Sequence, residues 1–146
     1  MLRPRFRFFT AVILLFLASG SLNAQIAAFK EPARDPGPAG QWRGDSVCTI
    51  KNSPCNDEIV VYEIAAVNGQ AATFTLKASK IVRGQREFMG LLDCTYEPST
   101  HALNCKAHEK PNGIWSFQMS GKSMQGTLVL EDKRLYRRIN VVRTKG

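Results

Sequence analysis

From residue 40 onward, apolar and polar residues alternate along short stretches of the chain. In the stretch 114–119, for example, Trp115, Phe117 and Met119 are each separated by one polar residue. A period of two places every second side chain on the same face of a β-strand. Such stretches predict strands at residues 41–49, 58–66, 72–78, 87–96, 102–108, 114–119, 124–130 and 134–143.

Turn-forming residues separate most of these predicted strands and keep the links between them short. Asn68-Gly69 is the strongest of the turn signals, because both residue types accept the positive φ of a tight hairpin. Short links require antiparallel neighbours, since the return to a parallel strand needs about a dozen residues or more. Closing the sheet removes its exposed edges. We therefore predict an all-β fold, an antiparallel up-and-down barrel of about eight strands.

The N-terminal segment has the composition of a secretory signal peptide. Arginines precede an apolar run at residues 8–18, and the segment ends at the small residue Ala24. A retained membrane anchor is the alternative, but the run is shorter than the roughly 20 residues that span a bilayer. We predict a signal peptide at 1–24, a spacer with prolines and glycines at 25–39, and one folded domain at 40–146. This organisation predicts a secreted or periplasmic protein with no transmembrane segment after cleavage.

The cysteines all lie in the predicted folded domain, where an even number predicts disulfides. Four cysteines allow three pairings, and the sequence alone does not decide among them. A hairpin centred on residues 98–101 places Cys94 opposite Cys105, at a cross-strand separation that a disulfide can bridge. That pairing leaves Cys48 with Cys55, across residues that favour chain reversal.

The start of the predicted domain resembles a known family. Gly40-Gln41-Trp42 is similar to the G-x-W motif that opens lipocalins and their calycin relatives. The resemblance implies a lipocalin-like barrel in which a basic residue of the last strand lies across the tryptophan, pairing Trp42 with Arg137 or Arg138. The stretches "DEIVVYEI", "WSFQMSGKSMQGTL" and "LYRRINVVR" also resemble small exported bacterial proteins to which no activity is assigned.

A lipocalin-like barrel implies a monomeric, non-enzymatic protein that binds a small apolar or amphipathic molecule. The alternating apolar side chains supply a candidate lining, which consists of Trp115, Phe117, Met119, Phe74, Leu76 and Leu128. The alternative is that these side chains fill a solid core, as they do in many eight-stranded barrels.

The sequence carries no recognised catalytic or metal-binding motif. G-x-S-x-G, H-E-x-x-H and phosphate-binding loops are missing, and the cysteine spacings differ from the close pairs of zinc sites. His101 and His108 are expected to be isolated surface residues. We therefore expect no enzymatic activity, no cofactor and no metal. Arg43-Gly44-Asp45 spells an adhesion tripeptide, but it falls within a predicted strand, where it would not protrude.

The basic residues suggest a second function, that of an envelope module that contacts polyanions. The formal net charge is +8, and loss of the three leader arginines leaves 8 − 3 = +5. One group of basic residues recurs at every third position and consists of Lys77, Lys80, Arg83 and Arg86. A second group lies near the C-terminus and consists of Lys133, Arg134, Arg137 and Arg138. The alternative is a solvated surface. Nucleic acid is not expected as a partner, because exposed aromatic residues are not interleaved with these charges. Glu63 is expected to face solvent or to pair with Arg137.

Overall fold

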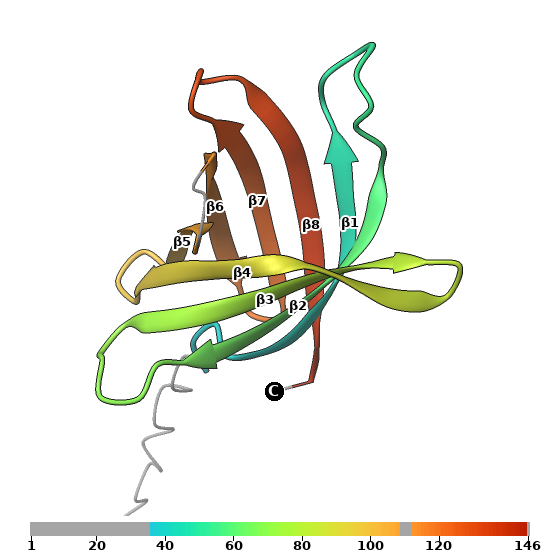
Figure 1. The fold of residues 1–146 in the computed structure, drawn as a ribbon. Coiled ribbons are helices and arrows are strands. Elements are labelled where there is room, and N and C mark those ends of the chain that lie inside the picture. The colour runs from blue at the N-terminus through green and yellow to red at the C-terminus, as the bar shows by residue number, and fades with distance from the viewer. Residues whose placement is uncertain (1–35, 109–111, 146) are drawn as a thin grey trace, which may run out of the picture. The chain divides into compact units, whose positions relative to one another are not determined.

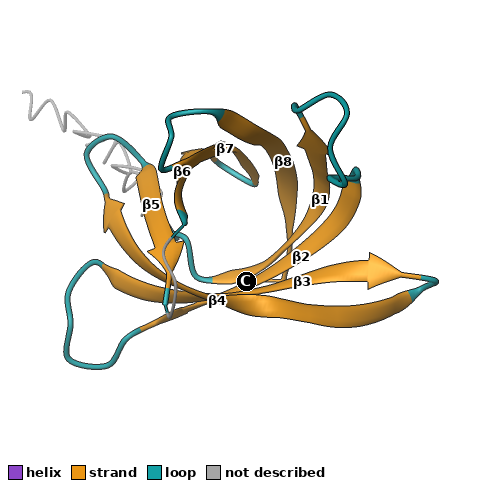
Figure 2. Ribbon diagram, turned by 45° about the horizontal axis from the view of Figure 1, so that its top comes forward, coloured by secondary structure: helices purple, strands orange, loops and turns teal. Residues whose placement is uncertain are grey.

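The computed structural model describes residues 36–108 and 112–145, and these residues form a closed antiparallel β-barrel (Figure 1). The strands are β1 (Gly40–Cys48), β2 (Glu58–Ala66), β3 (Thr73–Val82), β4 (Gln85–Glu97), β5 (Ala102–Ala107), β6 (Gly113–Ser120), β7 (Ser123–Leu130) and β8 (Leu135–Lys145). They follow one another around the barrel in chain order, and β1 pairs with β8 to close it (Figure 2). The predicted eight-stranded up-and-down barrel is thus confirmed. The predicted signal peptide, 1–24, lies outside the described residues.

The strand bounds agree with the predicted ones to within two residues, except in the hairpin formed by β3 and β4. The sequence predicts no strand at residues 79–86, but residues 79–82 belong to β3 and residues 85–86 to β4, so the prediction is wrong for both segments. The two strands are joined by the two-residue turn Arg83-Gly84, whose φ angles are both positive, at 50° and 80°. Such a turn matches the twist of paired strands and allows a long, tight hairpin. Figure 1 shows this hairpin extending past the neighbouring strands.

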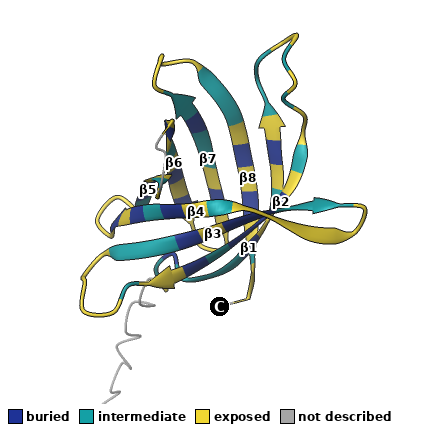
Figure 3. Ribbon diagram, in the orientation of Figure 1, coloured by how far each residue is buried: buried dark blue, intermediate teal, exposed yellow. Residues whose placement is uncertain are grey.

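Every second side chain of the strands points into the barrel. In β8, Ile139 and Val141 are buried, and the residues on either side of them are exposed (Figure 3). A glycine makes room for one of the interior rings: a Cβ atom at Gly126 would lie only 2.3 Å from the ring of Phe117 on the neighbouring strand. Gly126 therefore provides the space that the Phe117 ring occupies.

Trp42 fills one end of the barrel, which we call the closed end. Its indole Nε1–H donates a hydrogen bond of 2.9 Å to the carbonyl oxygen of Pro38. The guanidinium carbon of Arg143 lies 4.2 Å from the centre of the indole ring. The same guanidinium donates to the carbonyl oxygens of the two residues that flank Pro38. The end of the predicted spacer, 25–39, thus belongs to the folded unit, whereas residues 25–35 lie outside the described residues.

The predicted pairing of Trp42 with Arg137 is wrong, and the reason is the direction of the strands. Because β1 and β8 are antiparallel, the beginning of β1 lies beside the end of β8. Trp42 therefore pairs with Arg143, whereas Arg137 pairs with Cys48 near the other end of the barrel. The expected arrangement, a basic residue of the last strand across the tryptophan, is provided by Arg143.

Two disulfides link the chain, and the structure contains both of the pairings that the turn chemistry favours. Cys94 and Cys105 lie opposite each other on β4 and β5 and are buried. Cys48 and Cys55 close the loop between β1 and β2 and are partly exposed.

We expect the substitution Arg143→Ala to lower the free energy of unfolding by about 2–4 kcal/mol, because it removes a cation–π contact and charged hydrogen bonds. Urea denaturation followed by circular dichroism measures the change. The matched control is Arg138→Ala, since Arg138 is an exposed residue of the same strand; its effect should stay within about 0.5 kcal/mol. Equal losses in the two variants would contradict this role for Arg143.

We expect a mild thiol reductant to open the Cys48–Cys55 disulfide before Cys94–Cys105, because only the first is accessible to solvent. Alkylation during partial reduction, followed by peptide mass mapping, identifies the sulfurs that are released first. Replacing both Cys94 and Cys105 with alanine should lower the free energy of unfolding by roughly 2.5–3 kcal/mol, since the closed loop is short. Early alkylation of Cys94 or Cys105 would show that the expected order is wrong.

Candidate functional site

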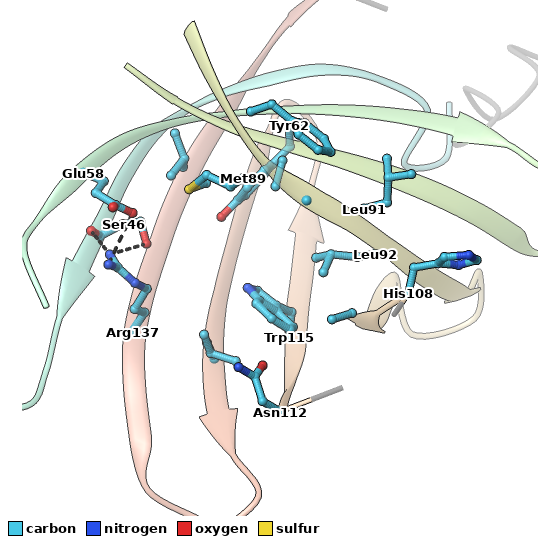
Figure 4. A pocket seen from close by; sticks show the side chains of 16 residues that line it. Ser46, Glu58, Tyr62, Met89, Leu91, Leu92, His108, Asn112, Trp115 and Arg137 are labelled. Carbon is cyan, nitrogen blue, oxygen red and sulfur yellow. Dashed lines mark hydrogen bonds and ion pairs between the residues drawn. The ribbon is translucent and has the colours of Figure 1, made fainter. Parts of the chain in front are cut away.

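The barrel contains a cavity of about 620 Å³ toward the end opposite Trp42, partly open to solvent. Its walls are largely aromatic and aliphatic and include Tyr62, Leu92, Trp115 and Leu128. Figure 4 shows Trp115 and Leu92 between two polar groups of side chains, one around Arg137 and the other at His108. This volume lies within the range of about 300–1,000 Å³ that is typical of small-molecule sites.

The cavity exists because β4 extends beyond its neighbour β5. Among the described residues, β5 pairs only with Leu92–Glu97 of β4, whereas β4 begins at Gln85. Within residues 36–108 and 112–145, the first part of β4 has its ladder partners on β3, and the register shifts at Met89, which has no partner on β3. Such a β-bulge bends a strand locally. Phe88 and Met89 consequently line the cavity while remaining exposed, with 63% of Phe88 accessible to solvent.

The predicted lining residues fall into two groups. Trp115 and Leu128 line the cavity. The other four pack in the interior and do not border the cavity; they are Phe117, Met119, Leu76 and Phe74. Phe117 meets the ring of Tyr62 edge-on, with ring centres 5.9 Å apart, so the base of the cavity is a packed aromatic layer. Both alternatives left open by the sequence therefore occur in one barrel, a solid core in one half and a cavity in the other.

Sequence reasoning missed the contribution of β2 to the cavity. Glu58, Val60 and Tyr62 share its inward face and line the cavity. The apolar run in this strand includes neighbouring residues, Val60 and Val61, which are both buried. The alternation of β2 is therefore ambiguous, and the sequence does not reveal which face points inward.

Arg137 is the central polar group of the cavity wall. Its Nη1 donates to the backbone oxygen and the hydroxyl oxygen of Ser46, at 3.1 and 3.2 Å. Its Nη2 lies 3.3 Å from Oε2 of Glu58. The second oxygen of the same carboxylate, Oε1, lies 3.7 Å from Nζ of Lys80. We call these four residues the charged wall; it combines two cations with one carboxylate, and all but Lys80 line the cavity.

Tyr62 lies close to the charged wall and is almost completely buried. Burial raises the pKa of its phenol strongly, because the phenolate loses hydration. The positive charge of Arg137 opposes this shift of the pKa, and the negative charge of Glu58 reinforces it. Tyr62 therefore remains a neutral phenol in the folded protein and presents an uncharged aromatic surface to the cavity.

The two histidines each have a side-chain partner. His108 lines the cavity, and its Nδ1 lies 2.9 Å from Oδ2 of Asp93. Nδ1 of His101 lies 3.2 Å from the hydroxyl of Tyr96. Within residues 36–108 and 112–145, no cluster of histidine, cysteine and acidic side chains could hold a metal ion.

The basic residues at every third position do not form one uniform patch. Lys77 and Arg86 both face Glu63, at 3.5 and 2.9 Å, on the outside of the barrel. Their charges, and the hydrogen bond from Arg86 first of all, lower the pKa of the Glu63 carboxyl. Glu63 thus lies on the outer face and does not pair with Arg137. Lys80 belongs to the charged wall, and Arg83 lies in the hairpin turn.

The second basic group is divided between the two faces of the barrel. Lys133 lies in the turn before β8, and Arg134 pairs with Asp132 at 2.6 Å. Arg138 is exposed on β8, whereas its neighbour Arg137 points into the cavity. This division follows from the period of two in a strand, which sends adjacent side chains to opposite faces.

The tripeptide Arg43-Gly44-Asp45 lies in the middle of β1, as expected. Both neighbouring strands pair with it, β2 on one side and β8 on the other. A Cβ atom at Gly44 would meet the backbone of Asn140 and Val141, so the glycine allows close approach of β8. The tripeptide is part of the barrel wall and not a protruding loop.

The fold and the cavity define a class of protein, namely a closed eight-stranded antiparallel barrel that encloses a partly open, mainly apolar cavity. No model of a known protein family matches the chain, and no curated protein sequence matches it. In the part of the chain that the structure describes, no helix is long and apolar enough to cross a membrane.

We expect the stability of the protein to fall at alkaline pH because of Tyr62. Its raised pKa keeps the phenol protonated in the folded state, whereas the unfolded state ionises near about pH 10. The stabilising contribution is thus complete below that pH and is lost as the pH rises above it, by roughly 1 kcal/mol per pH unit. Urea denaturation of the wild type and of Tyr62→Phe at about pH 8 and about pH 11 tests this expectation. The same decline in both proteins would contradict it.

Proposed function

We propose that this protein is an exported, non-enzymatic binding protein that holds a small apolar or amphipathic molecule inside its barrel. The observation that carries the proposal is the cavity of about 620 Å³, with Trp115, Leu92 and Leu128 in its wall. Apolar walls with a few convergent polar groups are typical of sites that bind small molecules. The proposal agrees with the lipocalin-like character that the N-terminal tryptophan motif implies.

The polar groups of the cavity favour binding over catalysis. Ser46 accepts its hydrogen bond from Arg137, and a nucleophilic serine would instead need a neighbouring base. His108 pairs with Asp93 away from the charged wall. These groups can orient a ligand, but their arrangement does not match a nucleophile with its base.

The two disulfides are consistent with an oxidising compartment, which supports export. They link Cys48 to Cys55 and Cys94 to Cys105, so the four described cysteines are all paired. Export to the periplasm or the medium would follow from the predicted signal peptide.

The alternative function, contact with envelope polyanions through a basic surface, has less support. Lys77 and Arg86 share the carboxylate of Glu63, and Arg137 points into the cavity. Because ion pairs and inward orientation reduce the exposed positive charge, these residues offer polyanions a weaker surface than the sequence suggested.

Binding of the neutral fluorescent dye Nile red to the oxidised protein tests the proposed function. We expect saturable binding, with an increase in dye emission, because the cavity excludes water from an apolar probe. Native mass spectrometry of protein exported by its own host would reveal a retained molecule as an added mass.

A matched pair of variants locates the bound dye. Ala107 lines the cavity, so Ala107→Phe should fill part of it and weaken dye binding by about tenfold or more. Ala65 is exposed on β2, and Ala65→Phe should leave binding unchanged. Circular dichroism confirms that both variants are folded. Failure of the wild type to bind the dye, or equal effects of the two substitutions, would contradict the proposal.

A further inference from the structure

The charge distribution within the cavity points to a more specific class of ligand. We propose that the cavity selects amphipathic anions, with the anionic head group at Arg137 and the apolar part against Trp115 and Leu128. This inference rests on the proposed function and goes beyond it by assigning the charge and the orientation of the ligand.

The first argument is an imbalance of charge in the wall of the cavity. Glu58 is shared, because one of its oxygens faces Arg137 and the other faces Lys80. Arg137 and Glu58 line the cavity, whereas Lys80 contacts Glu58 without lining it. One carboxylate therefore balances two cations, and the charged wall carries a net positive charge. His108, which also lines the cavity, pairs with Asp93 and lies away from this wall (Figure 4). The local excess of positive charge favours an anion as the missing partner.

The second argument is burial, which strengthens the attraction. Only 12% of the Arg137 side chain is accessible, compared with 21% for Glu58 and 34% for Lys80. Interactions between charges are stronger in such surroundings than on an open surface, because less water screens them. Arginine also offers a planar set of donors that matches a carboxylate or phosphate group. A bound anion would thus gain charge-assisted hydrogen bonds in a site that already holds the guanidinium in place through Ser46.

The third argument is the position of the apolar surface relative to the charged wall. Leu128 pairs directly with Arg137 across β7 and β8, and Trp115 pairs with Leu128 across β6 and β7. An apolar surface therefore begins beside the guanidinium and continues across the cavity wall. Phe88 and Met89 extend it to the exposed rim. The cavity wall thus has a charged part at Arg137 and an apolar part beside it. This arrangement fits a molecule with one charged end and one apolar end.

The experiment compares laurate with lauryl alcohol, which has the same chain but no charge, as competitors of bound Nile red. Both are used below the concentration at which laurate forms micelles. We expect laurate to displace the dye at a concentration about tenfold lower, since a charge-assisted hydrogen bond contributes roughly that factor or more. Added salt should weaken the binding of laurate and leave that of lauryl alcohol nearly unchanged.

Two substitutions in the charged wall should act in opposite directions. Arg137→Gln removes a cation and should weaken laurate binding by about 10–100-fold. Glu58→Gln removes the competing carboxylate and should strengthen laurate binding several-fold. Neither substitution should change the binding of lauryl alcohol by more than about threefold, because the apolar wall is untouched. Arg138→Gln, on the exposed face of the same strand, is the matched control and should bind both molecules as the wild type does.

The outcomes separate this inference from the proposed function. If laurate and lauryl alcohol bind equally, or if folded Glu58→Gln binds laurate no better than the wild type, the anionic preference is overturned and the binding function stands. If Nile red, laurate and lauryl alcohol all fail to bind, both proposals are overturned. Should Arg137→Gln not fold, the expected gain in Glu58→Gln still decides the question.

Discussion

The stacking of Arg143 on Trp42 joins the two ends of the folded chain, and the architecture depends on this contact. The two residues lie on β1 and β8, the strands most distant in sequence, whose pairing turns an open sheet into a barrel. The contact holds the buried indole under a cation that also anchors the segment before β1. Trp42 is completely buried at this end, and the cavity lies toward the other end.

The same strand supplies the main charged group of the cavity. Arg137 and Arg143 share the inward face of β8, with Ile139 and Val141 between them. At the closed end, the guanidinium of Arg143 is covered by an aromatic ring and backbone carbonyls. At the other end, Arg137 meets a shared carboxylate in a partly open cavity. One inward face thus combines an arginine at the closed end with one that lines the cavity.

The separation of β4 from β5 determines where the solid core ends and the cavity begins. The Cys94–Cys105 disulfide holds the two strands together close to the point at which their pairing stops, at Leu92 and Ala107. Beyond that point, among the described residues, β4 continues as a pair with β3 through the bulge at Met89. The cross-link therefore secures the packed half of the barrel while leaving the other half open. This arrangement explains how a small domain contains both a stable core and a cavity.

The sequence by itself determined the elements of the barrel, because alternation and turn chemistry are local properties. It indicated the antiparallel order of the strands and the hairpin that opposes Cys94 and Cys105. The hairpin around Arg83-Gly84 escaped prediction, since Arg-Gly is an uncommon turn pair and regularly spaced basic residues obscured the alternation. The run in β2 was ambiguous because its apolar residues occupy both faces.

Only the tertiary structure decided which residues meet across the barrel. The pairing of Trp42 with Arg143 depends on the register of strands at opposite ends of the chain, which no local pattern contains. The cavity likewise depends on where β5 stops relative to β4. The charged wall depends on the convergence of four strands, which supply Ser46, Glu58, Lys80 and Arg137. The sequence predicted the inward face of β8 through its period of two. The residues of β1 that meet this face are determined by the closure of the barrel, because only closure brings the first and last strands together.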